Sequence, residues 1–433
     1  MFNFLALLFT GLLVVGVYLY KKSLKPQVKP QAPVQVPKRK ASGKQETPAA
    51  ETKTESSQPQ LSNKDLKRQE NELKKAQKKI KRANPTHSTF LRGFKGFKGS
   101  VSDFDVSPDG EYVVACSSDG TFRIFRSTDF TEQEPQSIYH KIDFHQPTSI
   151  SLKHDKKLVA VGMAEPRMVE FYSIDEKTTY DDGVKTKVSV SFLKKSDERL
   201  HKTNMKHMFL DFEGKFYVTG SDEEDTTIKA WSLSGENLAS FATSQLRNHH
   251  ILRSENGRFL AVAAWTSDVM IVELKTNKDG SLKSLGKAMA LKGHRKGIID
   301  VNFNPTNDKV VTLSKDQTIK LWNIDVRYEM SEDPKCLETI NINDHEELKV
   351  LVDATATRLG LLSVNSRDLI LMTHHSNIII FDVQKNKVID TIVNAHSEGS
   401  QIYKLAFKEH KGKPYLYTCG DDGRINMWDF GSF

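Results

Sequence analysis

Cysteine is scarce in this chain of 433 residues, which holds only Cys116, Cys336 and Cys419, and no two of them form a Cys-x-x-Cys pair. The sequence therefore gives no basis for a disulfide framework or a thiolate zinc site, and a reducing compartment is favoured. The Gly-x-Ser-x-Gly motif of serine hydrolases is also missing. The histidine pairs His249–His250 and His374–His375 have no carboxylate or cysteine at ligand spacing. We expect no enzymatic activity, no metal and no cofactor.

A glycine-rich stretch, GFKGFKGS at Gly93–Ser100, lacks two features of a phosphate-binding loop. It has no Gly-Lys-Ser/Thr ending, and no helix start follows it. A strand followed by a turn is the prediction for this stretch.

Charged side chains are absent from Phe2 to Tyr20, a run that would span about 28 Å as a helix. The basic n-region and the small-residue cleavage site of a secretory signal peptide are missing, so residues 1–20 are predicted to be a transmembrane anchor. Lys21, Lys22 and Lys25 follow directly, and the positive-inside rule then predicts a single-pass protein whose remainder faces the cytosol.

Residues 21–84 form a basic low-complexity linker rich in Lys, Pro, Gln, Ser and Thr. The linker has 18 Lys and Arg against 6 Asp and Glu, so its net charge of +12 leaves −4 for the rest of a chain whose total is +8. A helix is possible at 63–82, but its hydrophobic stripe is too thin to predict a coiled coil. A solvated spacer, a contact with anionic lipid and a contact with RNA all stay open for the linker.

Short hydrophobic strands recur along the rest of the chain. Seven copies can be aligned, and the intervals between their ends run from 41 to 60 residues. We place the extra length of the longer intervals in polar loop insertions such as Asp175 to Lys195 and Asp325 to Lys335. The seven copies end at Phe125, Phe171, Trp231, Val272, Trp322, Phe381 and Trp428.

The stretches FKGSVSDFDVSPDGEYVV and LKGHRKGIIDVNFNPTNDKVV each place two strands around a turn that contains proline. With the strands that follow them, they resemble the WD40 repeat family, and the resemblance covers residues 88–430. It implies an all-β fold, a seven-bladed WD40 β-propeller at 85–433, with the predicted N-terminal transmembrane helix and basic linker before it. STFLRGFKG, which precedes the first copy, would then supply the outer strand of the last blade and close the ring.

In the family's pattern, a histidine, a hydroxyl residue, an aspartate and a tryptophan share hydrogen bonds within one blade. Each polar group would cost about 1–3 kcal/mol if it were buried without a partner, so the aspartate is expected to be structural rather than catalytic. In the third copy, either Ser221 or Thr219 is predicted to supply the hydroxyl group. The matching residues are His294, Thr312, Asp316 and Trp322 in the fifth copy, His396, Thr418, Asp422 and Trp428 in the seventh, and His201, Asp225 and Trp231 in the third.

Two longer stretches, SPDGEYVVACSSDGTFRIFRSTDF and TSQLRNHHILRSENGRFLAVAAWTSDVMIVEL, are similar to WD40 proteins of the endoplasmic-reticulum membrane. This resemblance implies a propeller in the cytosol that associates with a PERK-type stress kinase and with ribosomal subunits, and that supports translation during stress.

Three functional interpretations stay open, because propellers host many unrelated activities. The first is a membrane-tethered scaffold for protein partners in the unfolded-protein response. A propeller that acts as a guanine-nucleotide exchange factor for a coat GTPase is the second, although such relatives carry their membrane span after the propeller. The third is a ribosome-binding or RNA-binding adaptor that acts through the basic linker.

Overall fold

The computed structural model describes residues 84–126, 135–143, 145–179, 185–196, 199–222, 226–352 and 356–433. The predicted anchor at 1–20, its flanking Lys21, Lys22 and Lys25, and the linker up to residue 83 with its possible helix at 63–82 lie outside these residues. Among the helices of the described part of the chain, none is long and apolar enough to cross a bilayer.

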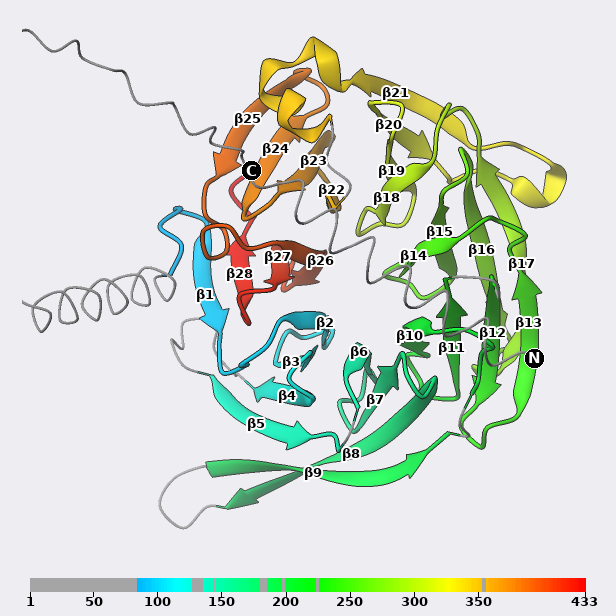
Figure 1. The fold of residues 1–433 in the computed structure, drawn as a ribbon, viewed down its shortest axis with the longest axis vertical. Helices are drawn as coiled ribbons and strands as arrows, with labels where there is room; N and C mark the ends of the chain where they lie inside the picture. The colour runs from blue at the N-terminus through cyan, green and yellow to red at the C-terminus, as the bar shows by residue number, and fades with distance from the viewer. Residues whose placement is uncertain are drawn as a thin grey trace, which may run out of the picture. The chain divides into compact units, whose positions relative to one another are not determined.

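Within the described residues, seven four-stranded antiparallel sheets surround a central axis, as Figure 1 shows. We number these sheets blades 1 to 7 and letter the strands of each blade a to d from the axis outward. The predicted seven-bladed propeller is confirmed, and each repeat end found in the sequence lies on the c strand of a different blade.

The first four blades follow one another along the chain. Blade 1 contains β2 (Val101–Val106), β3 (Tyr112–Ser117), β4 (Thr121–Arg126) and β5 (Gln136–Lys141). Blade 2 contains β6 (Pro147–Leu152), β7 (Leu158–Met163), β8 (Met168–Thr179) and β9 (Lys185–Lys195). Blade 3 contains β10 (Met205–Leu210), β11 (Phe216–Ser221), β12 (Thr227–Ser232) and β13 (Asn237–Ala242). Blade 4 contains β14 (Asn248–Arg253), β15 (Phe259–Ala264), β16 (Val269–Thr276) and β17 (Leu282–Leu291).

The last three blades complete the circle. Blade 5 contains β18 (Ile298–Phe303), β19 (Lys309–Ser314), β20 (Thr318–Asn323) and β21 (Lys335–Asn341). Blade 6 contains β22 (Leu359–Val364), β23 (Arg367–His374), β24 (Asn377–Asp382) and β25 (Lys387–Ile392). Blade 7 contains β26 (Ile402–His410), β27 (Lys413–Gly420), β28 (Ile425–Asp429) and, as its outer strand, β1 (Phe90–Phe94).

Ring closure follows from that last strand. β1 pairs antiparallel with β28, so residues that precede blade 1 in the sequence complete blade 7. Gly93 to Ser100 form the end of β1 and the loop before β2, as the strand-and-turn prediction stated. The hydrogen bonds between β1 and β28 thereby fix the segment that leads into blade 1 to blade 7, and β28 has no free edge.

Burial falls from the middle of each blade to its outer strand. The b strands β3, β11 and β15 are buried at every position, because both of their faces pack against neighbouring blades. The outer strands β5 and β13, by contrast, show mostly exposed and half-buried residues. Hydrophobic clusters fill the seven interfaces between successive blades, so the core is a circle of wedges rather than one central mass.

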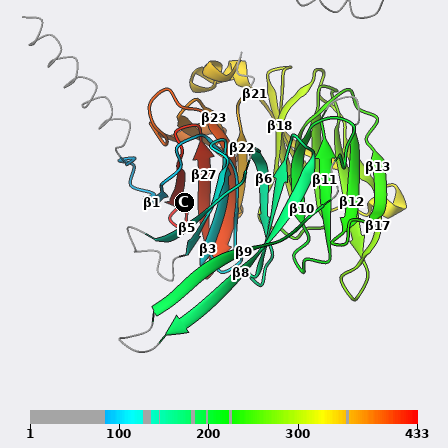
Figure 2. The same cartoon turned by 60° about the horizontal axis from the view of Figure 1, so that its bottom comes forward.

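One insertion that was predicted to be a loop is a pair of strands instead. Asp175 to Lys195 was expected to be a loop, but β8 and β9 pair through Thr179 and Lys185 and project from blade 2 as a two-stranded ribbon (Figure 2). The alternation of Lys185 to Lys195, KTKVSVSFLKK, with Val188 buried, explains the ribbon.

The Asp325–Lys335 insertion is a loop with one short 3-10 helix, η1 (Tyr328–Met330). Two further 3-10 helices, η2 (Ile342–Asp344) and η3 (Glu346–Leu351), lie between blades 5 and 6 and bury Leu348 and Leu351 there.

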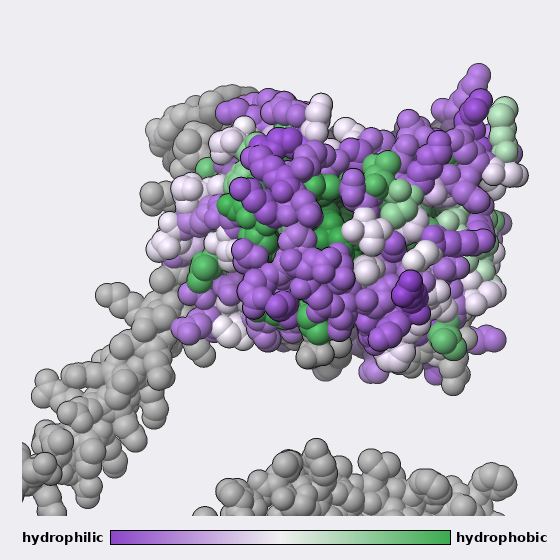
Figure 3. Space-filling view, turned by 90° about the horizontal axis from the view of Figure 1, so that it is seen from above, coloured by the Kyte–Doolittle hydropathy of each residue, from purple (hydrophilic) through white to green (hydrophobic). Residues whose placement is uncertain are grey.

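The side of the ring seen in Figure 3 is mostly hydrophilic, and its hydrophobic side chains form small areas interrupted by polar ones.

Candidate functional site

Blade 5 joins the four residues that the repeat pattern predicted. The indole N–H of Trp322 donates to Thr312 Oγ1 at 2.9 Å, and Thr312 Oγ1 lies 2.7 Å from His294 Nε2. His294 Nδ1 lies 3.1 Å from a carboxylate oxygen of Asp316. Because the Asp316 carboxylate can only accept, the ring proton of neutral His294 is on Nδ1, and Nε2 accepts from the Thr312 hydroxyl. The chain of donors ends on the Asp316 carboxylate.

The electrostatics of this chain fit a structural role. Burial by itself raises the pKa of Asp316, but hydrogen bonds from Thr318 and from the Arg295 N–H, with His294 close by, bring that pKa below its ordinary value. Burial also lowers the pKa of His294. At neutral pH, an ionised aspartate therefore ties the loop before β18 to the turn after β19.

Blade 7 repeats the arrangement. Trp428 Nε1 donates to Thr418 Oγ1 at 3.1 Å, and His396 lies 2.9 Å from both Thr418 Oγ1 and Asp422 Oδ1. The backbone N–H of Ser397 donates to the other Asp422 oxygen at 2.9 Å. Burial by itself raises the pKa of Asp422, but the hydrogen bond with His396 and the N–H of Ser397 bring that pKa below its ordinary value.

The structure of blade 3 shows which of the two candidate hydroxyls, Thr219 or Ser221, belongs to the hydrogen-bonded set. Thr219 Oγ1 lies 2.8 Å from His201 Nε2 and accepts from Trp231 Nε1 at 2.9 Å. Ser221 Oγ instead lies 2.5 Å from Thr203 Oγ1. Thr219 is therefore the member of the set, whereas Asp225 lies outside the described residues.

Blade 1 keeps only part of the pattern. Asp119 accepts from the Lys98 N–H at 2.8 Å, and Phe125 stands where blades 3, 5 and 7 have tryptophan. The Phe125 ring packs edge to face against Phe94 with centroids 5.2 Å apart. Apolar packing thus replaces the hydrogen-bonded indole in this blade.

The central channel is lined by a circle of side chains that the sequence reasoning did not single out. The pairing of the a and b strands shifts register after the first residue of the a strand in every blade except blade 6. The third residue of these a strands comes directly after the irregularity. Those third residues are Asp103, Ser149, His207, His250, Asp300 and Lys404. Their shared position in each a strand is the signal that could have found them.

Carboxylates in this circle bind the backbone of the next blade. Asp103 accepts from the Ile150 N–H at 3.0 Å, and Asp300 accepts from the Leu359 N–H at 2.7 Å. An a strand is the inner edge of its sheet, so its outward N–H groups need partners from elsewhere. These channel acids supply them, which is a structural role.

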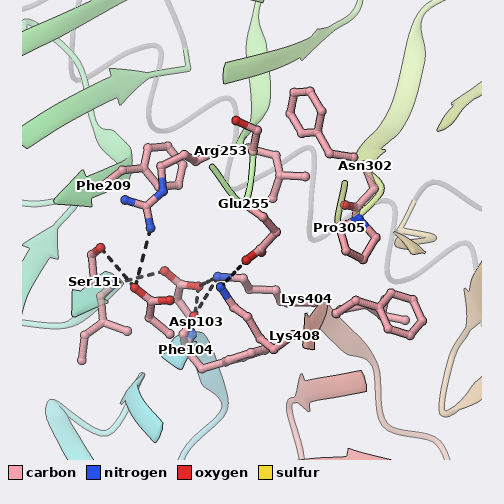
Figure 4. Close-up of a pocket in the computed structure, with 18 of the residues that line it drawn as sticks. Asp103, Phe104, Ser151, Phe209, Arg253, Glu255, Asn302, Pro305, Lys404 and Lys408 are labelled. Carbon is pink, nitrogen blue, oxygen red and sulfur yellow. Dashed lines mark hydrogen bonds and ion pairs between the residues drawn. The ribbon is translucent and has the colours of Figure 1, made fainter. Parts of the chain in front are cut away.

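Along the a strands, lysine side chains pair with these and other acids. Lys404 Nζ lies 2.6 Å from Asp103 and 2.8 Å from the Phe104 carbonyl, while Lys408 Nζ lies 2.7 Å from Glu255 (Figure 4). Burial by itself lowers the pKa of Lys404, but Asp103 and Asp105 raise it above its usual range. The cavity around these pairs is about 60 Å³, which leaves little room for a ligand.

The mouth of the channel is wider and more basic. A cavity of about 420 Å³ opens there, and among its lining residues are Lys206, Arg358, Lys404, His207, His249 and His250, with Asp103 as its carboxylate. Two buried carboxylates behind this lining hold its side chains in place: Asp300 lies 2.5 Å from His250 and 3.6 Å from Arg358, and Asp222 binds Lys206 and, at 3.3 Å, Arg247. The mouth therefore presents cationic groups that are anchored from behind.

Two histidines of the mouth have ring nitrogens that lack a hydrogen-bond partner among the residues the structure describes, His207 Nε2 and His249 Nδ1. Burial lowers the pKa of His207 well below its ordinary value, and it also lowers the pKa of His249. Both rings are therefore neutral at pH 7 and add no charge to the cations of the mouth. Fixed cations beside neutral imidazoles suit recognition of an anionic group.

The described residues contain no cluster of three or more His, Cys, Asp or Glu that could hold a metal. His249 and His250 turn to different partners, the Ile299 carbonyl at 3.0 Å and the Asp300 carboxylate. His374 and His375 pack with ring centroids 4.5 Å apart. The predicted absence of a metal and of enzymatic activity stays a prediction.

Comparison with known families agrees with this geometry. The family model described as "WD domain, G-beta repeat" matches residues 88–126, 286–323 and 387–429, which end on the c strands of blades 1, 5 and 7. The chain carries WD40 repeats. Blades 5 and 7 are those in which all four residues of the hydrogen-bonded set are described, while blade 3 is formed by a stretch that the family model does not match.

Similar proteins extend the comparison beyond single repeats. Human "Transducin beta-like protein 2" is 29% identical over 340 residues, 78% of this chain and 71% of the relative, and the mouse protein of that name is 28% identical over 338 residues, with the same coverage of each chain. The rice "Ribosome biogenesis protein BOP1 homolog" is 22% identical over 367 residues, 79% of this chain and 51% of the relative. The predicted resemblance to the WD40 family and, within it, to transducin beta-like protein 2 is confirmed.

Proposed function

We propose that this protein is a non-enzymatic scaffold tethered to the endoplasmic-reticulum membrane, with its propeller in the cytosol, that binds protein partners. The observation that carries the proposal is the channel mouth, where anchored cations line an open cavity on a rigid ring. The histidines and aspartates of blades 5 and 7 are engaged in hydrogen bonds that hold each blade's own loops in place, which is consistent with binding rather than catalysis.

The membrane tether is supported by the uncharged run from Phe2 to Tyr20 and by the lysines that follow it. Tethering raises the effective concentration of the propeller near other membrane proteins, so a modest affinity suffices for association.

Partners in the unfolded-protein response follow from the likeness to transducin beta-like protein 2, which covers 78% of the chain. We propose association with a PERK-type stress kinase and with ribosomal subunits, in support of translation during stress. The likeness to a ribosome biogenesis protein supports the ribosomal part of this proposal.

Proximity labelling tests the proposal directly. The full-length protein should label endoplasmic-reticulum proteins, the stress kinase and ribosomal proteins, and a variant without residues 1–20 should lose the membrane neighbours. Absence of kinase and ribosomal proteins from both samples would contradict the proposed partners. A soluble distribution of the full-length chain would contradict the tether.

A second candidate role is contact with ribosomes, RNA or anionic lipid through the basic linker, favoured by its net charge of +12. Deleting residues 38–84 should then abolish co-sedimentation with ribosomes, and unchanged sedimentation would show that the propeller makes the contact instead. The exchange-factor alternative predicts accelerated nucleotide release from a coat GTPase, which the same purified protein can test.

A further inference from the structure

Trp265 is an exposed tryptophan on the rim of the ring. It lies in the turn between β15 and β16 of blade 4, and 52% of its surface is exposed, whereas Trp322 and Trp428 are buried in their hydrogen-bonded sets. Leu246, in the loop that leads into blade 4, is 78% exposed. Exposed tryptophans are uncommon on surfaces that bind nothing and are enriched where binding energy concentrates.

Two cations from different loops flank the indole. The Arg247 guanidinium lies 5.3 Å from the ring centroid, and the Lys315 ammonium lies 4.9 Å from it. Arg247 belongs to the loop before β14, while Lys315 belongs to the turn after β19 of blade 5. The fold thus assembles one indole and two cations from three segments that are separate in the sequence.

This arrangement is held in place before any partner binds. The Lys315 N–H donates to the Gly297 carbonyl at 2.9 Å, and the Ile298 N–H donates to the Thr266 carbonyl at 3.2 Å. A side chain at Gly297 would meet the Trp265 carbonyl at 2.9 Å, so the two loops are in close backbone contact. Asp316, next to Lys315, is fixed by the hydrogen-bonded set of blade 5. Binding at such a site costs little ordering entropy.

The positively charged side chains around Trp265 indicate an acidic partner. Among the described residues, no carboxylate lies within ion-pair distance of Lys315, and Arg295 and Lys296 of the neighbouring loop are also exposed. Asp222, which Arg247 and Lys206 share, is 1% exposed, whereas the side chains of Arg247 and Lys206 are 33% and 42% exposed. The chain's own linker, with its net charge of +12, is repelled by this surface.

We propose that the surface formed by Leu246, Arg247, Trp265 and Lys315 binds an extended acidic segment of another protein. An apolar side chain of that segment packs on Trp265 and Leu246, and its carboxylates pair with Arg247 and Lys315. Asp222 and Lys206 connect this surface to the channel mouth, so the segment continues toward the mouth cations. The inference rests on the proposed role in binding proteins and names the chemistry of the partner.

The probe is a fluorescein-labelled peptide with one leucine flanked on each side by glutamates, titrated against the full-length protein in detergent with anisotropy as readout. We expect binding that weakens as salt increases, and weaker binding when lysines replace the glutamates or alanine replaces the leucine. Trp265→Ala and Lys315→Glu should each weaken binding at least about tenfold, while Lys315→Arg should preserve it. The peptide should also protect Trp265 fluorescence from iodide quenching.

Tyr139 supplies the matched control. It is an exposed aromatic residue on β5, 63% exposed, with the Arg123 guanidinium 5.1 Å from its ring centroid. Tyr139→Ala should leave peptide binding unchanged. The inference is overturned if Tyr139→Ala and Trp265→Ala have equal effects, if the lysine peptide binds as well as the glutamate peptide, or if the affinity of the glutamate peptide is weaker than about 1 mM.

Failure here is distinguishable from failure of the proposed function. If the proximity-labelled partners persist in the Trp265→Ala protein and the peptide does not bind, only this surface is wrong. If the peptide binds through Trp265 while neither kinase nor ribosomal proteins are labelled, the surface stands and the proposed partners are wrong.

Discussion

Phe90 and Trp428, from opposite ends of the propeller sequence, face each other across the strand pair that closes the ring. Their Cα atoms are paired in the register of β1 and β28, and their rings meet edge to face with centroids 5.4 Å apart. The Asp429 N–H adds a hydrogen bond to the Thr89 carbonyl at 2.8 Å. Closure therefore depends on both backbone pairing and aromatic packing.

Phe90→Ala should lower the free energy of unfolding by about 2 kcal/mol, less than a fully buried phenylalanine would cost, because Phe90 is half-buried. Chemical denaturation monitored by circular dichroism measures the change. Leu91→Ala, at a neighbouring position that is 39% exposed, is the control and should change stability little. Equal effects of the two substitutions would show that the Phe90–Trp428 contact does not stabilise the ring.

Asp316→Ala removes the acceptor that ends the hydrogen-bonded chain of blade 5. We expect a loss of about 1–3 kcal/mol in the free energy of unfolding, because His294 and the Arg295 N–H lose their partner. Asp325→Ala in the exposed loop after β20 is the control. Loss of partner binding with unchanged thermal stability would contradict the structural role of Asp316.

Thr219→Val preserves the shape of the side chain but removes the hydroxyl shared by His201 and Trp231. The free energy of unfolding should fall by about 1–3 kcal/mol, since two buried donors or acceptors are left without a partner. Ser221→Ala should cost less, because the partner of its hydroxyl among the described residues is the half-buried Thr203 hydroxyl. A larger loss of stability for Ser221→Ala than for Thr219→Val would indicate that Ser221, and not Thr219, belongs to the hydrogen-bonded set of blade 3.

Lys404→Met leaves the channel carboxylates of Asp103 and Asp105 without their central cation. A loss of about 2 kcal/mol is expected, below the range for a fully buried pair because both side chains are partly exposed. Adding Asp103→Asn should recover part of the loss, since the amide oxygen still accepts the Ile150 N–H. Lys287→Met on the exposed outer strand of blade 4 is the control, and a double variant as unstable as the single one would contradict the pairing.

The lowered pKa of His207 should make the stability of the propeller depend on pH. Its pKa lies well below 6.5 in the folded chain because of burial, and Lys206, His250 and Arg358 face it as further groups that disfavour its charge. Below about pH 6.5 the unfolded chain binds a proton that the native chain does not, so stability falls as pH decreases. His207→Phe should therefore flatten the decrease in melting temperature between about pH 7 and pH 5. An unchanged slope would mean that the pKa of His207 is the same in the native and unfolded chains.

The sequence by itself determined the repeat count, the c strands, the closing strand and the hydrogen-bonded sets of blades 5 and 7. These features depend on alternation of hydrophobic residues and on fixed spacings within one repeat, which a sequence displays directly. The same local reasoning was wrong for Asp175 to Lys195. Residues beyond the usual repeat length were predicted to be a loop, although the alternation of hydrophobic and polar residues continues to Lys195.

Only the tertiary structure decided which side chains meet across blades. The third residues of a strands from different blades form the channel circle, and Arg247 and Lys315 flank Trp265. Each of these contacts joins segments whose separation in sequence is unrelated to any strand or helix period. The angle between neighbouring blades brings them together, and that angle is fixed by packing of the whole ring.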